Sequence, residues 1–223
     1  MKELIELTKH IKNKELREKV VKFIKDTELS SKDFKKYERE DLDKAGSVFG
    51  VSSSSMGPVE RDVISHTVQV TELAIEAAKI FEKNYGLNLD MDYLIAAAIL
   101  HDIMKAYEYH RDFEDDLVPT GLTLDHTMLA VAELYHRNFP EEIIHIVASH
   151  PGDAGTVSPR SFEALILHHV DSMCSVIEYY IESKKKMEQK LAVLRRQELL
   201  SLNDEQRETG TDVQSDKGNT EED

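Results

Sequence analysis

The most informative stretch of this chain is Leu94-Ile-Ala-Ala-Ala-Ile-Leu100-His101-Asp102-Ile-Met-Lys105, in which a histidine and an aspartate directly follow seven apolar residues. We predict that it lies in one helix over residues 91–107. Adjacent side chains on an ideal helix point about 100° apart, so His101 and Asp102 can reach one cluster only from its rim. A site that uses both should therefore lie close to the C-terminal half of this helix.

Four further residues with the same kinds of side chain stand on or at the ends of other predicted helices: His66, His126, His150 and Asp171. Imidazole and carboxylate are groups that divalent transition metals take as ligands. Two metal ions at bridging distance use about this many ligands and leave positions open for water and a phosphate. A single histidine on such a helix is more often a hydrogen-bonded core or surface residue, so the complete set carries this prediction.

Apolar residues at three- and four-residue spacing predict an all-α fold, in which no segment reads as a strand. The predicted helices cover residues 2–12, 14–27, 31–45, 59–83, 91–107, 125–138, 140–149 and 159–197. Ser31 is a good N-cap for the third of these helices. Asp125 or Thr123 is the expected N-cap of the helix that begins with His126.

Residues 46–57 are rich in glycine and serine, which is typical of a loop. We expect this Gly/Ser loop to separate an N-terminal helical extension, residues 1–45, from a helical-bundle metal domain, residues 58–200. Two interpretations of the loop stay open. It is either a flexible linker or a flap over the active site, where its backbone amides and serines meet a phosphate.

The charge of the chain is strongly negative and unevenly spread. The net charge is −15 over 223 residues, which argues against a general nucleic-acid binder because phosphate contacts need a basic surface. Residues 201–223 carry eight acidic residues against Arg207 and Lys217, a net of −6, which leaves −9 for residues 1–200. We predict that this acidic tail is disordered and that it serves solubility.

Cys174 is the single cysteine of the chain, which excludes an intrachain disulfide and fits a reducing compartment. Its expected role is that of a small buried hydrophobic residue. The first residues alternate charged with apolar side chains and lack a signal-peptide core. No apolar run approaches the roughly 20 residues of a membrane span. We therefore expect a cytoplasmic protein that does not contact a membrane.

The order His…His-Asp…His…His…Asp resembles that of the HD-domain metal-dependent phosphohydrolases over about residues 58–183. The matching strings are Ile64-Ser-His66-Thr, Leu100-His101-Asp102-Ile-Met-Lys105, Leu124-Asp-His126-Thr, Ala148-Ser-His150-Pro-Gly152 and His168-His169-Val-Asp171. The resemblance implies that Asp102 bridges two metal ions and that a metal-bridged hydroxide attacks phosphorus.

The resemblance also implies which side chains hold each ion. The first ion takes His66, His101, Asp102 and Asp171. The second takes Asp102, His126 and His150. Such nitrogen and oxygen ligands suit Fe(II), Mn(II), Co(II) or Zn(II). Fe(II) is the expected metal, with Mn(II) next.

Lys105 follows Asp102 by three residues and matches the lysine of the family string His-Asp-x-x-Lys. Met104 stands where glycine usually precedes that lysine. The resemblance implies that Lys105 is catalytic and neutralises phosphate charge. Three further polar residues are weaker candidates. His168 is a candidate to orient Asp171, while Arg61 and Arg160 are candidate phosphate contacts.

A narrower resemblance covers most of residues 2–183. It rests on Lys14-Glu-Leu-Arg-Glu-Lys-Val-Val, on the Gly/Ser loop and on Glu60-Arg-Asp-Val-Ile-Ser-His66. These strings look like the archaeal phosphodiesterases that open 7,8-dihydroneopterin 2′,3′-cyclic phosphate in methanopterin biosynthesis. That family uses ferrous iron and yields the 2′- and 3′-monophosphates.

Two other functions stay open at this point. One is a different HD-domain hydrolase, a 3′–5′ exoribonuclease or a nucleotidase. The other is a non-catalytic HD-domain sensor or scaffold. The expected partner is a small-molecule phosphoester rather than a nucleic acid, and the chain is a candidate homo-oligomer.

Overall fold

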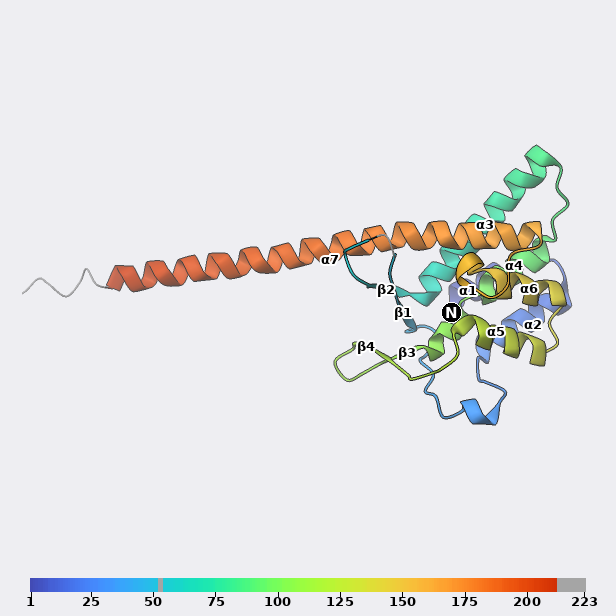
Figure 1. Cartoon of the computed structure of the whole chain (residues 1–223), viewed down its shortest axis with the longest axis horizontal. Coiled ribbons are helices and arrows are strands. Elements are labelled where there is room, and N and C mark those ends of the chain that lie inside the picture. The colour runs from blue at the N-terminus through green and yellow to red at the C-terminus, as the bar shows by residue number, and fades with distance from the viewer. Residues whose placement is uncertain (52–53, 212–223) are drawn as a thin grey trace, which may run out of the picture. The chain divides into compact units, whose positions relative to one another are not determined.

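The computed structural model describes residues 1–51 and 54–211, with side chains as far as residue 202 (Figure 1). Met1–Tyr180 forms one compact unit, and a second unit begins at Ile181. The first unit holds every candidate site residue. As predicted, most of the described residues are helical.

The N-terminal extension contains fewer helical residues than predicted. Helices α1 (Lys2–Leu7) and α2 (Lys14–Lys25) lie within the predicted helices, and a 3₁₀ turn, Thr8–His10, follows α1. The helix predicted over residues 31–45 is wrong, because only a 3₁₀ turn at Lys32–Phe34 forms there and Ser31 makes no side-chain cap. Phe34 and Tyr37 are only partly buried against the core, so the segment gains little of the apolar burial that stabilises a helix in a protein.

Two short antiparallel strand pairs contradict the expectation of a fold without strands. Strand β1 (Gly46–Phe49) pairs with β2 (Val59–Asp62), and β3 (Tyr109–Arg111) pairs with β4 (Leu117–Pro119). The Gly/Ser loop therefore begins as a strand, and the helix predicted from residue 59 begins at Val63. Strands of three or four residues are too short for alternation to reveal them in a sequence.

The helices of the metal domain follow the predicted order. They are α3 (Val63–Tyr85), α4 (Met91–Leu100), α5 (His126–His136), α6 (Glu141–Ser149) and α7 (Phe162–Thr211). Aspartate caps three of them: the side chains of Asp62, Asp90 and Asp125 accept hydrogen bonds from backbone N–H groups at the starts of α3, α4 and α5. Asp125, rather than Thr123, is the N-cap before His126.

The helix predicted over residues 91–107 is two elements rather than one. Helix α4 ends at Leu100, and the 3₁₀ helix η3 covers Ile103–Tyr107. His101 and Asp102 form the turn between them. Asp102 has φ −107° and ψ −1°, which departs from regular α-helix, so the two adjacent side chains are no longer held 100° apart by one helix.

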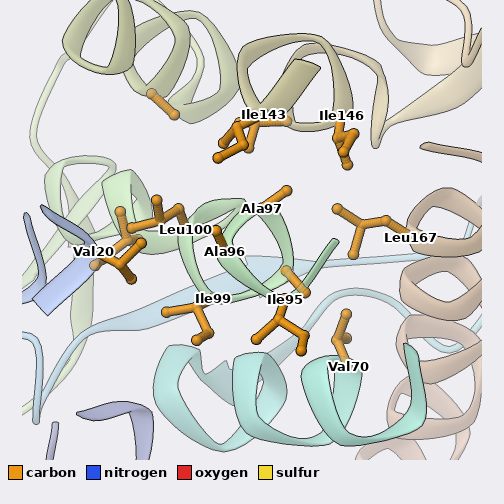
Figure 2. Close-up of a cluster of buried hydrophobic side chains, with 14 of the residues drawn as sticks. Val20, Val70, Ile95, Ala96, Ala97, Ile99, Leu100, Ile143, Ile146 and Leu167 are labelled. Atoms are coloured by element: carbon orange, nitrogen blue, oxygen red, sulfur yellow. The ribbon is translucent and has the colours of Figure 1, made fainter. Parts of the chain in front are cut away.

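Helix α4 is the centre of the hydrophobic core. Its residues from Leu94 to Leu100 are all buried, as expected for a helix that is apolar on every side. Figure 2 shows side chains of α4, from Ile95 to Leu100, among Val20 of α2, Val70 of α3, Ile143 of α6 and Leu167 of α7. This packing carries the turn that follows α4 into the interior, where His101 and Asp102 are almost fully buried.

The last helix is longer than predicted. The backbone of α7 is helical through Thr211, beyond residue 197, where this helix was expected to end. The rest of the predicted acidic tail, residues 212–223, lies outside the described residues. Within the described residues, no helix is both long enough and apolar enough to cross a membrane.

Candidate metal centre

All six predicted ligands meet at one place in the first unit, although they come from five different elements. His66 lies on α3, His101 and Asp102 follow α4, His126 begins α5, and His150 directly follows α6. Ligand atoms of His66, His101 and Asp102 lie within 4.8 Å of one another, as do those of Asp102, His126 and His150. The sixth predicted ligand, Asp171 on α7, places Oδ1 2.9 Å from His66 Nε2 and 3.9 Å from His101 Nε2.

Asp102 is the residue common to both groups, and each of its oxygens faces a different pair of histidines. Oδ2 lies 3.5 Å from Nε2 of His66 and 3.5 Å from Nε2 of His101. Oδ1 lies 3.3 Å from Nε2 of His126 and 3.7 Å from Nε2 of His150. A carboxylate in this position has the geometry needed to join two adjacent cation sites.

The Nδ1 atoms of the four histidines are all engaged on the side away from Asp102. His101 and His150 each place Nδ1 2.7 Å from the backbone carbonyl three residues earlier, that of Ala98 and of Val147. The remaining two, His66 and His126, have carboxylate partners. When each Nδ1 carries the proton and donates it outward, each Nε2 presents a lone pair to the centre of the cluster.

Several buried polar atoms at this centre have no hydrogen-bond partner among the described residues: His101 Nε2, Asp102 Oδ1 and His126 Nε2. Buried polar atoms are almost always paired, because leaving one unpaired costs about 1–3 kcal/mol. Imidazole nitrogens and carboxylate oxygens facing one another are the donor set of a divalent transition metal. The residues present therefore fit the metal pair that the sequence implied.

Burial, hydrogen bonds and neighbouring charges shift the pKa of several groups in the cluster, and against the effect of burial the carboxylate partners raise the pKa of His66 and of His126. Burial opposes ionisation of Asp102, but the neighbouring charges of Lys105 and His101 hold its pKa well below the usual range. Burial likewise opposes ionisation of Asp171, and the hydrogen bond from His66 outweighs it and lowers the pKa. Burial and the adjacent His101 lower the pKa of His150 to about 3. At neutral pH these carboxylates are charged and His150 is neutral.

Two buried cations contact the shared carboxylate. Lys105 places Nζ 2.7 Å from Asp102 Oδ2, and Arg61 of β2 places Nη2 3.2 Å from the same oxygen. Arg61 also lies 3.3 Å from Glu178 Oε2, and its side chain is only 7% exposed. The Arg61 guanidinium therefore has partners inside the protein. From the sequence, Arg61 had been a candidate to contact the phosphate of a substrate.

His168 has a different position from the one considered. Its Nδ1 lies 2.8 Å from the backbone carbonyl of His150, rather than against Asp171. The ring packs on Gly152, where an added Cβ would lie 2.1 Å from His168 Cε1. His168 thus supports the turn that follows the ligand His150. Arg160 donates its backbone N–H to His145, and within the described part of the chain its side chain makes no hydrogen bond or ion pair with the cluster.

Sequence reasoning missed two glutamates that contact the predicted ligands. Glu178 Oε2 lies 3.0 Å from His66 Nδ1, and Glu108 Oε1 lies 2.7 Å from His126 Nδ1. Glu178 follows Asp171 by seven residues, two helical turns on the same face, so helical spacing carried a signal. Residues 102, 105 and 108 share a face only where the chain has three residues per turn, as in η3. The single α-helix predicted there concealed Glu108.

Comparison with known proteins assigns the class of this molecule. The HD domain family matches residues 63–175, which is half of the chain and includes all six predicted ligands. The chain belongs to the HD domain family, a family of metal-dependent phosphohydrolases, as its resemblance implied.

The similar proteins include a relative that covers most of the chain. The dihydroneopterin 2′,3′-cyclic phosphate phosphodiesterase of Methanocaldococcus jannaschii is 41% identical over 180 residues, which are 79% of this chain and 70% of the relative. The 3′-5′ exoribonuclease YhaM of Bacillus subtilis is 31% identical over 119 residues, which are 48% of this chain and 36% of the exoribonuclease. No solved structure matches the chain significantly.

Proposed function

We propose that this protein hydrolyses 7,8-dihydroneopterin 2′,3′-cyclic phosphate to its 2′- and 3′-monophosphates, in tetrahydromethanopterin biosynthesis. The observation that carries the chemistry is Asp102, whose two oxygens each face a pair of buried histidine nitrogens. The substrate rests on the likeness to the methanogen phosphodiesterase, which covers 79% of this chain.

The proposed ligands of the first metal ion are His66, His101, Asp102 and Asp171. Those of the second are His126 and His150, together with the shared Asp102. When bound, a pair of divalent cations supplies a water-derived nucleophile at neutral pH and stabilises charge on the phosphoryl oxygens. Fe(II) is the proposed native metal, with Mn(II) next, because the ligands are nitrogen and oxygen only.

Lys105 is the proposed catalytic cation. Its Nζ already lies 2.7 Å from the shared carboxylate in a nearly buried position. In that place, a protonated amine is close to any phosphate that reaches the metal ions. Its charge offsets negative charge that builds up on the phosphoryl group, and the low local dielectric strengthens the effect.

The first residues of the Gly/Ser loop are proposed to support the site rather than to act only as a linker. Its first residues form β1, and Ser47 Oγ accepts a hydrogen bond of 3.2 Å from Arg61 Nε on the paired strand. Arg61 in turn contacts Asp102. This chain of contacts links the hairpin to the cluster, which favours a role at the site. Residues 52–53 of the loop lie outside the described residues.

The proposed boundaries stay those expected from the sequence: an extension over residues 1–45, the loop 46–57, the metal domain 58–200 and a tail 201–223. The cytoplasm is the proposed compartment, since the single cysteine is a free and buried thiol. Burial raises the pKa of Cys174 to about 11, so the thiol stays protonated. A homo-oligomer that does not bind nucleic acid is also proposed.

Exoribonuclease activity is the second candidate, since the likeness to YhaM covers 48% of this chain. The net charge of −15 argues against it, because long polyanions are repelled at low salt. A small cyclic phosphodiester carries one negative charge, which Lys105 and two cations offset locally. The third candidate, a non-catalytic sensor or scaffold, leaves the complete ligand set and Lys105 without a role.

An anaerobic assay with protein reconstituted with Fe(II) or Mn(II) tests the proposed function. We expect dihydroneopterin 2′,3′-cyclic phosphate to be opened faster than 2′,3′-cyclic AMP, and bis-p-nitrophenyl phosphate to be slower than both. The Asp102→Ala variant, prepared in the same way, measures the background. Processive degradation of short RNA with untouched cyclic phosphates would replace the pterin proposal with the exoribonuclease function.

A further inference from the structure

The four histidines of the cluster divide into two kinds by what their Nδ1 atom contacts. In His101 and His150 the contact is a backbone carbonyl of the preceding helix, at 2.7 Å in each case. In His66 and His126 it is a carboxylate, Glu178 at 3.0 Å and Glu108 at 2.7 Å. A carboxylate partner makes an imidazole a stronger base than a neutral carbonyl partner does.

The two kinds of histidine are distributed evenly between the proposed metal ions. The first ion takes one carboxylate-held histidine, His66, and one carbonyl-held histidine, His101. The second takes His126, held by Glu108, and His150, held by a carbonyl. Each ion therefore has one histidine ligand whose Nδ1 atom contacts a glutamate. Neither glutamate belongs to the ligand groups around Asp102.

Two hydrogen-bond arrangements are open to the His66 ring, and Glu178 favours one of them. Arg61 Nη1 also lies 3.0 Å from His66 Nδ1, and a guanidinium only donates hydrogen bonds. If Nδ1 accepted from Arg61, the proton would stand on Nε2, where Asp171 Oδ1 accepts it at 2.9 Å. That form of His66 cannot ligate a metal. Glu178 opposes it by accepting a hydrogen bond from the protonated Nδ1.

Glu108 holds His126 by two contacts. Oε1 is 2.7 Å from the ring Nδ1 and 3.2 Å from the backbone N–H of the same residue. His126 is the first residue of α5, so Glu108 orients both the ring and the start of the helix that carries it. The side chains of Glu108 and Glu178 are 23% and 13% exposed. Both lie near the edge of the core, so substitution of either should leave the fold intact.

We propose that Glu178 and Glu108 are positioning residues, one for each metal ion, which contact Nδ1 of His66 and of His126 and so hold each ring with Nε2 facing Asp102. This inference rests on the metal ligands of the proposed function. It adds that each ion depends on a different glutamate, so that the two metal sites can be weakened separately.

Metal binding by four variants tests this inference: Glu108→Ala, Glu178→Ala, Glu108→Gln and Glu178→Gln. We expect each alanine variant to keep one firmly bound ion per chain and to bind the other about 10–100-fold more weakly. Loaded with Mn(II), wild-type protein should give the spin-resonance signal of a coupled pair, and each alanine variant that of a single ion. The glutamine variants should fall between, since an amide oxygen accepts the hydrogen bond without the charge. Glu72→Ala, which removes an exposed acid from α3, is the control and should bind as wild type.

Double variants assign the weakened ion. Adding His126→Ala to Glu108→Ala should remove no further ion, whereas adding His66→Ala to Glu108→Ala should remove the second one. Nitrogen-15 spectra of metal-free Glu178→Ala should show the His66 proton on Nε2. Wild-type protein that binds no metal would overturn the proposed function itself. Wild type that binds two ions, with alanine variants that bind them equally well, would overturn only the roles of Glu108 and Glu178.

Discussion

At the scale of single residues, Asp102 is a buried carboxylate that needs charged neighbours to stay ionised. Its side chain is 1% exposed, so a carboxylate there loses the stabilisation of water. Lys105 and Arg61 contact Oδ2 at 2.7 and 3.2 Å and offset that loss. Oδ1 has no hydrogen-bond partner among the described residues, which leaves it available to a cation.

Asp102→Ala should abolish hydrolysis and weaken both metal ions, because among the described residues only Asp102 belongs to both groups of ligands. The helical fold should persist, as Arg61 keeps Glu178 as a partner. Steady-state rates and metal analysis, with circular dichroism as the folding control, measure this. A variant that keeps more than about a tenth of the wild-type rate, a loss below ~1.4 kcal/mol of barrier, refutes the bridging role.

Lys105→Ala should slow hydrolysis while both metal ions stay bound, because a protonated amine is not a ligand. A cation that stabilises phosphoryl charge in a partly dry site is worth ~2–4 kcal/mol, by analogy with the loss of one oxyanion donor. The rate and the metal content are measured on the same sample. Lys79→Ala, which changes an exposed lysine of α3, is the matched control. Equal rates for Lys105→Ala and the control would assign Lys105 a structural role only.

At the scale of elements, most of the proposed ligands lie at or next to the ends of helices, whereas Asp171 lies within α7. His126 is the first residue of α5, His101 directly follows α4, and His150 directly follows α6. The positions of the ligands therefore depend on where each helix starts and stops. Caps and breaks, which contribute little buried surface, have a large effect on the site.

Asp125→Ala should show this dependence. The Asp125 side chain accepts the backbone N–H of Met128 at 2.8 Å and so caps α5. Its loss should lower the free energy of unfolding by about 1 kcal/mol and weaken the metal ion that His126 binds. Denaturant unfolding and metal titration measure both effects, and Asp125→Asn, which retains a capping oxygen, should restore most of each. A lower free energy of unfolding with unchanged metal binding would show that the cap does not affect the metal site.

At the scale of the whole molecule, the proposed metal ions connect elements that are distant along the chain. His66 and Asp171, which meet at 2.9 Å, are 105 residues apart. Anything that binds only the folded chain stabilises it, and ligands from separate helices are shared only in that state. The cluster is therefore expected to contribute to stability as well as to catalysis.

Removal of the metal ions with a chelator should lower the melting temperature, and reloading with Fe(II) or Mn(II) should restore it. The melting temperature should rise further as the metal concentration increases, because metal that binds the folded state stabilises it by mass action. Thermal scans at several metal concentrations measure it. The Asp102→Ala variant serves as the control and should show a much smaller shift. A wild-type melting temperature that does not respond to metal would contradict the proposed centre.

Deletion of residues 201–223 should reduce solubility more than it reduces activity. The segment carries eight acidic residues against two basic ones and few large apolar side chains, so it contributes charge rather than core. Precipitation curves, rates and melting temperatures of the truncated and full-length proteins give the comparison. A large drop in melting temperature on truncation would show instead that the segment packs on the protein.

The sequence by itself determined the helical class and the positions of all six candidate ligands, and it limited the cap before His126 to Asp125 or Thr123. These features are local. A helical stripe repeats every three or four residues, and each ligand stands at a fixed place beside such a stripe. The histidines that face Asp102 are therefore identifiable from the order of residues along the chain.

Only the tertiary structure decided the break after Leu100, the two strand pairs and the carboxylates behind His66 and His126. The partners in the contact of His66 with Glu178 are 112 residues apart, and no local period encodes a contact of that range. The segment 31–45 has helix-forming residues, but its aromatic side chains are only partly buried, so packing rather than propensity decided its form. Packing around the buried helix α4 fixes which helix ends meet in the interior. It therefore set the distances between the side chains of the site.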